Sequence, residues 1–393
     1  MDQRPKIDDY GVIGDCRSTA LVSRSGSIDW LCWPRYDSPA IFAAIVDQKL
    51  GGRWSISPVQ RFASRRSYLG DSNVLETEFV LPDGRATLTD LMPVASEEFK
   101  RENLVPDHEL LRQIVCTEGE FEIEVDFVPR AFYGCKAVRI RDAGSYGLRM
   151  DVGRGAYWLR SNIPLAIGQD KESFKARIKL KRGETYQFSL SYSENSPTVL
   201  PALGLRASEA ITRSIAWWTG WAARSKYEGP YRDAVIRSAL ALKLLAYAPS
   251  GAVTAAATTS LPERIGDGLN WDYRYCWLRD ASLTVRTLLG LGYIEEAESF
   301  LGWLLHATRL TQPELRILYN VFGEIAPREK PLGWLQGYFD SRPVRIGNDA
   351  RHQLQLDVYG EVIEASAQYI NATGNLSRST QKVLTGLGKY VAR

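Results

Sequence analysis

Residues 119–128, GEFEIEVDFV, place an apolar side chain at every second position and an acidic one between most of them. Because successive side chains of a strand point to opposite faces of its sheet, this period of two predicts a half-buried β-strand. Similar runs extend from about residue 10 to residue 192, with turn signals at Asp83-Gly84, Glu118-Gly119 and Arg182-Gly183. Many short antiparallel strands at this spacing predict an N-terminal β-sandwich.

Near residue 207 the apolar period changes to that of an α-helix. Ser208 is placed to cap one helix and Pro230 to open the next, and further helical patterns cover about 280–291, 294–308, 352–372 and 377–392. The loops at 250–279 and 311–351 are long, as functional loops often are. We therefore expect a multi-domain β + all-α chain, divided into a β-sandwich at 1–205, a linker helix at 206–226 and a helical domain at 227–393.

Composition limits the partners of the chain. Its 393 residues are 45% hydrophobic and 24% charged, as in soluble globular proteins, and the net charge is only +3. So weak a field predicts neither nucleic acid nor a membrane surface as partner. No signal peptide follows Met1, and the five Cys form no C-x-x-C pair, so we expect free thiols and a cytoplasmic protein.

Metal and cofactor motifs are missing from the sequence. Three His occur without an H-E-x-x-H or Cys/His spacing, and neither a Walker loop nor a complete dinucleotide fingerprint is present. We expect no metal and no cofactor.

The segment Asn270–Asp280, NWDYRYCWLRD, is the first candidate site. It combines four aromatic rings with two Asp and two Arg at the end of a long loop. Rings stack on the C–H faces of a sugar, while carboxylates and guanidinium groups bind its hydroxyls, so the segment fits a polyol site. Two structural alternatives stay open: ion pairs among these Asp and Arg residues that hold a buried loop, and Asp280 as a helix N-cap.

A second polar cluster covers Ser341–Glu361, SRPVRIGNDARHQLQLDVYGE. Within it, Gln353, Asp357 and Glu361 recur at helical spacing and predict one polar face, which a solvated surface would also explain. A third cluster, Ala255–Glu263, is small and polar and ends in a carboxylate.

At these clusters the sequence resembles bacterial glycoside hydrolase family 15, the glucoamylase, glucodextranase and trehalase-like enzymes. NWDYRYCWLRDAS, SRPVRIGN and QLDVYGEV carry the resemblance, together with the opening at Ile7–Asp47. It implies an N-terminal β-supersandwich, a linker helix and an (α/α)6 barrel of the six-hairpin glycosidase type.

The resemblance also implies exo-acting, inverting hydrolysis of an α-linked glucoside or oligosaccharide, a reaction of carbohydrate metabolism. One carboxylic acid protonates the leaving oxygen while a second carboxylate activates water on the opposite face. Matching the Trp-x-Arg-Asp segment assigns Arg279 and Asp280 to the hydroxyls of the terminal glucose in the −1 subsite and Trp277 to its wall. Weaker matches place four further residues at the pocket wall or behind it: Tyr273, Arg345, Asn348 and Gln355.

The sequence departs from the family at its C-terminal end. The Gly-Ile-Trp-Glu stretch with the general acid and the distant segment with the base are both absent, and the barrel helices number about five instead of twelve. We therefore expect a truncated chain with an incomplete barrel, no catalytic residue and no activity by itself. The alternative is a non-catalytic sugar-binding or interaction module, and uncovered helix faces predict self-association through the incomplete barrel.

Overall fold

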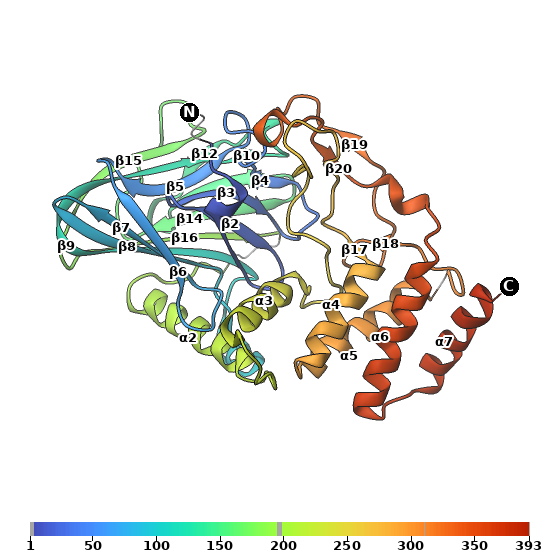
Figure 1. The fold of residues 1–393 in the computed structure, drawn as a ribbon. Coiled ribbons are helices and arrows are strands. Elements are labelled where there is room, and N and C mark those ends of the chain that lie inside the picture. The colour runs from blue at the N-terminus through green and yellow to red at the C-terminus, as the bar shows by residue number, and fades with distance from the viewer. Residues whose placement is uncertain (1–3, 195–198, 310, 393) are drawn as a thin grey trace. The chain divides into compact units, whose positions relative to one another are not determined.

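The computed structural model describes residues 4–194, 199–309 and 311–392. The chain forms two compact units, Met1–Trp221 and Ala222–Arg393, which are coloured blue to green and yellow to red in Figure 1. Each unit is described by itself.

The N-terminal unit is an antiparallel β domain. Its central path runs β1-β2-β3-β5-β9-β16-β14-β13-β12, while β4, β6, β7, β8 and β15 pair at its sides. The strands are β1 Tyr10–Gly14, β2 Thr19–Ser23, β3 Ser27–Cys32, β4 Ala40–Phe42, β5 Arg53–Pro58, β6 Ala63–Tyr68, β7 Leu75–Leu81, β8 Gly84–Leu91, β9 His108–Val128, β10 Arg130–Ala131, β11 Lys136–Ala137, β12 Ile140–Asp142, β13 Leu148–Val152, β14 Gly155–Ser161, β15 Phe174–Lys181 and β16 Thr185–Ser193.

Strand β9 joins two sheets. Its first half pairs with β8 and β16, and its second half pairs with β5 and β15. The predicted turn at Glu118-Gly119 is wrong, because the chain continues through these residues as one strand. Gly119 has φ +72°, and an added Cβ would lie 1.9 Å from the Asp83 carbonyl oxygen, so only glycine fits there.

The apolar faces of both sheets meet in one core. Phe121, Ile123, Val125 and Phe127 are all at most 3% exposed, as their period of two predicts. Trp54 packs edge-on against Phe127 of its own sheet and against Phe188 of β16. Inside this core the fully buried Arg112 and Asp90 form an ion pair at 2.7 Å.

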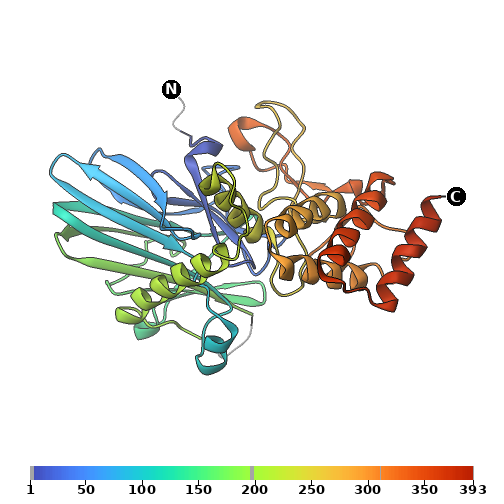
Figure 2. The same cartoon turned by 60° about the horizontal axis from the view of Figure 1, so that its bottom comes forward.

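Helix α2, Leu205–Ala222, lies along the sheet (Figure 2). Its Ala207, Ala210 and Ile211 pack against Leu91 and Leu111. The helix begins before Ser208, so the prediction that Ser208 caps it is wrong; the Ser208 hydroxyl contacts Gln113 and Gln187 instead. The short helices of this unit are η1 Ile7–Asp9, α1 Glu97–Glu102 and η2 Gly144–Tyr146.

The C-terminal unit is helical. Helix α4 packs against α5 and α6, and α6 packs against α7 (Figure 1). Its elements are α3 Arg232–Leu245, β17 Cys276–Trp277, α4 Leu278–Gly290, α5 Ile294–Ala307, β18 Leu318–Tyr319, β19 Lys330–Pro331, η3 Tyr338–Asp340, β20 Arg345–Ile346, η4 Asp349–His352, α6 Asp357–Thr373 and α7 Arg378–Val391. An antiparallel β domain followed by a helical region is thus confirmed, and the incomplete (α/α)6 barrel stays a prediction.

Among the described residues, no helix has both the length and the apolar character that crossing a membrane requires.

Candidate functional site

The segment 270–280 turns from a loop into a helix at the candidate site. Cys276 and Trp277 form β17, which pairs with β18, and α4 begins at Leu278. The N-cap is Trp277, whose backbone is extended. The alternative that Asp280 is the N-cap is therefore wrong: its carboxylate lies in the first helical turn, where the helix dipole favours a negative charge.

Asp272 and Arg274 form a buried ion pair in the loop that precedes β17. The guanidinium donates Nε to Asp272 Oδ1 at 2.8 Å and Nη2 to Oδ2 at 2.7 Å, and both side chains are at most 1% exposed. Asp272 Oδ2 also accepts a hydrogen bond from the amide of Gly347 at 3.1 Å. This pair therefore holds a buried loop in place, which was the alternative to sugar binding. Its hydrogen bonds join the segment 270–280 to the loop that contains Gly347.

Arg345 and Asn348 lie in the same loop framework. The Arg345 guanidinium stacks on the ring of Trp271, 4.4 Å from its centroid, and pairs with Glu329 at 2.9 Å. The Asn348 side chain donates to the Asp272 carbonyl at 3.1 Å and accepts from the amide of Ala350 at 2.9 Å. Both side chains are thus engaged inside the protein, which suits residues behind a pocket.

A different group of predicted residues gathers at the start of α4. The rings of Tyr273 and Trp277 are 5.8 Å apart, and Arg279 Nη2 lies 3.3 Å from Asp280 Oδ2. Arg279 and Asp280 remain 39% and 43% exposed. The start of α4 thus brings together two aromatic rings, one guanidinium group and one carboxylate.

Among the described residues, two atoms of this group make no hydrogen bond: the buried indole Nε1 of Trp277, and Oδ2 of Asp280, which has the ion-pair contact with Arg279 Nη2 at 3.3 Å instead. One is a donor and the other an acceptor. A buried polar group without a hydrogen bond costs free energy, and a bound hydroxyl is one group that supplies the missing bond.

Gln355 joins this group from the loop before α6. Its Oε1 accepts from Arg279 Nη1 at 3.4 Å, and its amide donates to Gln353 at 3.1 Å. Asp357, at the start of α6, was not among the predicted site residues, yet its Oδ2 lies 3.3 Å from Arg279 Nη1. The helical spacing of Asp357 and Glu361 is the sequence signal that could have identified Asp357 as a site residue.

Helix α6 supplies two ion pairs to α4. Asp357 pairs with Arg279, and one turn further Glu361 pairs with Arg286 at 2.9 Å. Both pairs are partly exposed, and they require α4 and α6 to run in the same direction. The acidic positions that also fit a solvated face therefore bind the neighbouring helix.

The protonation state of Tyr273 follows from its surroundings. Burial raises the pKa of its phenol, and the nearby carboxylates of Glu263 and Asp280 raise it further. The phenol therefore stays protonated near neutral pH and is able to donate a hydrogen bond.

No group of three or more His, Cys, Asp or Glu suited to a metal ion occurs in the described part of the chain. The arrangement at α4 offers hydrogen-bond donors, acceptors and ring faces, a combination that fits a sugar.

Comparison with protein families gives two adjacent matches. Residues 2–194 match the trehalase-like N-terminal domain, and residues 229–393 match glycosyl hydrolases family 15. The chain belongs to glycosyl hydrolase family 15. The resemblance seen in NWDYRYCWLRDAS, SRPVRIGN and QLDVYGEV is thus confirmed.

Several curated relatives are named trehalases. The trehalase of Mycolicibacterium smegmatis is 34% identical over 382 residues, covering 92% of this chain and 56% of the relative. That of Thermoplasma volcanium is 32% identical over 374 residues, covering 94% and 58%. Trehalase 1 of Sulfolobus acidocaldarius is 34% identical over 374 residues, covering 93% and 60%. The chain therefore spans less than two thirds of the length of these relatives.

Proposed function

We propose that the start of α4 forms the sugar-binding half of an α-glucosidase site, and that the chain descends from an exo-acting, inverting enzyme. The observation that carries this proposal is the buried indole Nε1 of Trp277, which makes no hydrogen bond among the described residues, beside the partly exposed Arg279–Asp280 pair. The indole N–H, the Asp280 carboxylate and the Arg279 guanidinium together match the alternating hydroxyls of a terminal glucose.

Each residue has a defined part in this binding. The Asp280 carboxylate accepts from one hydroxyl, and Arg279 donates to its neighbour. Trp277 donates its indole N–H and, with Tyr273, offers ring surface to the sugar. Gln355 orients Arg279, and Arg345 and Asn348 hold the supporting loop through the contacts described above.

Trehalose is the α-glucoside we favour, because the relatives that match over more than nine tenths of this chain are named trehalases. Maltooligosaccharides and dextran-derived sugars present the same non-reducing glucose, so the residues at α4 would bind all three. Discrimination then depends on contacts to the second sugar.

We further propose that residues 1–393 alone bind the sugar without hydrolysing it. Inverting hydrolysis needs an acid and a base about 6.5–9.5 Å apart across the bond. The family stretch that bears the acid has no counterpart within these residues. Losing an acid or base typically lowers the rate by about 10²–10⁴-fold.

Three further proposals concern the molecule as a whole. The first is the division of the chain into a β-sandwich at 1–205, a linker helix at 206–226 and a helical domain at 227–393. A cytoplasmic location is another, supported by five free cysteines, four of them buried. Self-association is the third: Tyr390 and Val391 of α7 are 39% and 43% exposed, and light scattering at several concentrations tests it.

Calorimetric titration of residues 1–393 with trehalose, maltose and isomaltose, with glucose release followed in the same samples, tests the function. We expect saturable binding of trehalose and no glucose release. Glucose release from trehalose at a rate typical of enzymes would refute the inactivity proposal. Absence of binding to any of the three sugars would refute the site.

A further inference from the structure

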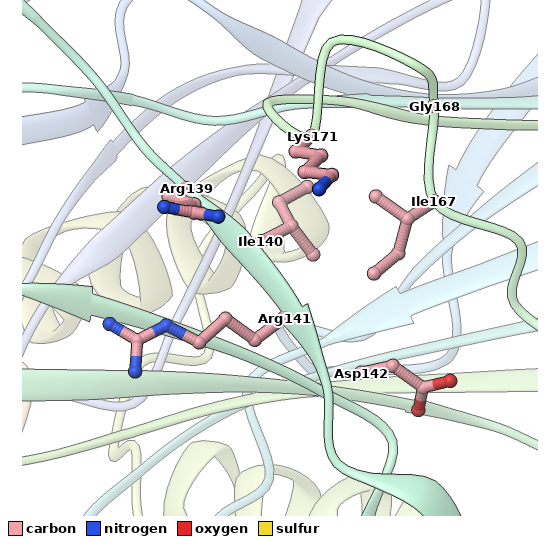
Figure 3. Close-up of a pocket in the computed structure, with 7 residues that line it drawn as sticks. All are labelled: Arg139, Ile140, Arg141, Asp142, Ile167, Gly168 and Lys171. Carbon is pink, nitrogen blue, oxygen red and sulfur yellow. The ribbon is translucent and has the colours of Figure 1, made fainter.

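A hollow lies in the β domain, far along the sequence from the residues of the sugar site. It has a volume of about 570 Å³ and is formed by the edge strand β12 and the loop that precedes β15. Its lining residues are Arg139, Ile140, Arg141, Asp142, Ile167, Gly168 and Lys171. In Figure 3, Lys171 reaches from the loop toward Ile140, Ile167 borders the same space, and Arg139 lies next to Ile140 in the chain, apart from Lys171.

Positive charge dominates this hollow. Three cations line it against one carboxylate, Asp142. Arg141 has a partner outside the lining, Asp151, at 3.4 Å. Arg139 and Lys171 have no ion-pair partner among the described residues, although most other cations of the neighbouring strands do. Two cations that line one hollow without a counter-ion favour an anionic ligand.

The backbone of Lys171 is an independent observation. Its φ is +56°, in the left-handed region that strains a residue with a Cβ. Two hydrogen bonds hold it there: its amide donates to the Gly168 carbonyl at 3.0 Å, and its carbonyl accepts from the Ile140 amide at 2.8 Å. Glycine would adopt this conformation without strain, so the presence of lysine at this position points to a role for its side chain.

The lining also restricts the class of ligand. None of the described residues that line the hollow is aromatic, and these residues provide no stacking surface of the kind found at the sugar site. Ile140 and Ile167 offer an apolar surface beside the cations. An anionic head with a small organic body fits both features, and a phosphate matches several cations better than a carboxylate does.

We propose that this hollow binds the phosphate monoester of a small organic molecule, with Lys171 and Arg139 on the phosphate and Ile140 and Ile167 on the organic part. The site is separate from the proposed glucosidase site, so either proposal can fail without the other.

Calorimetric titration of residues 1–393 with phenyl phosphate tests the proposal, with inorganic phosphate and neutral phenyl glucoside as comparisons. We expect one site for phenyl phosphate, weaker binding of inorganic phosphate and none of the glucoside. Lys171→Gly and Arg139→Gln should each raise the Kd at least tenfold. Lys175→Gln is the matched control, since Lys175 lies on β15 outside the hollow and pairs with Glu124 at 2.9 Å; it should leave the Kd unchanged.

Lys171→Gly separates function from folding. Because glycine adopts positive φ without strain, this variant should unfold at a temperature no lower than the parent while losing the ligand. Non-saturable binding, or equal weakening in Lys175→Gln, would show a general charge effect and overturn the proposal. Unchanged binding in both Lys171→Gly and Arg139→Gln would overturn it as well.

Discussion

The two arginines of NWDYRYCWLRD are predicted to have opposite roles, and replacing each by methionine tests this. Arg274→Met removes a guanidinium that is 1% exposed and makes two hydrogen bonds to Asp272. Arg279→Met removes one that is 39% exposed and makes only long contacts, at 3.3–3.4 Å. Methionine keeps much of the arginine stem and supplies no charge.

The structure sets the size of each effect. Without Arg274, the fully buried Asp272 keeps only backbone donors, and breaking a buried pair in this way costs about 3–5 kcal/mol. At ~2–4 °C per kcal/mol for a unit of this size, the Tm of the helical unit should fall by roughly 6–20 °C. A partly exposed pair such as Arg279–Asp280 contributes about 0–1 kcal/mol, so Arg279→Met should unfold within a few degrees of the parent.

Scanning calorimetry and a trehalose titration of both variants give the readouts. We expect Arg274→Met to be destabilised, and Arg279→Met to be stable but at least tenfold weaker in sugar binding. The double variant Asp272→Asn/Arg274→Met should recover part of the lost stability, because no unpaired charge remains buried. Equal stability of the two single variants, or unchanged sugar binding in Arg279→Met, would refute the division between a structural and a binding arginine.

Two further predictions concern other carboxylates. Burial raises the pKa of Glu109 to about 7, so the folded state holds this proton more tightly than the unfolded state does, and the associated stability is lost as pH rises from about 4.5 to 7. Glu109→Gln should therefore gain stability relative to the parent over that range, by up to roughly 3 kcal/mol at pH 8; a difference independent of pH in urea unfolding would contradict this. Asp357→Asn should weaken trehalose binding about tenfold by freeing Arg279, whereas Glu361→Gln, which breaks the neighbouring pair with Arg286, should not. Equal Kd values for these two variants would show that Asp357 does not position Arg279.

The local features of the fold were predictable from the sequence. The period of two in residues 121–127 identified the buried face of β9, and helical periods located α4, α5 and α7 to within about two residues. These features depend on neighbours along the chain. Gly119 was misjudged because a positive φ suits both a turn and the point where one strand passes between two sheets, and only long-range pairing distinguishes them.

The candidate site was predictable in its residue types but not in its pairings. Asp272 and Arg274 are two residues apart and form the buried pair, while the adjacent Arg279 and Asp280 stay exposed. Burial of a loop depends on what packs over it, which spacing does not contain. The contact of Arg279 with Asp357, 78 positions later, depends on the register between α4 and α6.

The binding of trehalose to residues 1–393 and to Asp280→Asn, compared by calorimetry, tests the central claim most directly. Asparagine keeps the size of the side chain and removes the charge that accepts a sugar hydroxyl. We predict saturable binding by the parent chain, a Kd at least tenfold higher in Asp280→Asn and an unchanged Tm. Equal Kd values for the two proteins would contradict a sugar site at the start of α4.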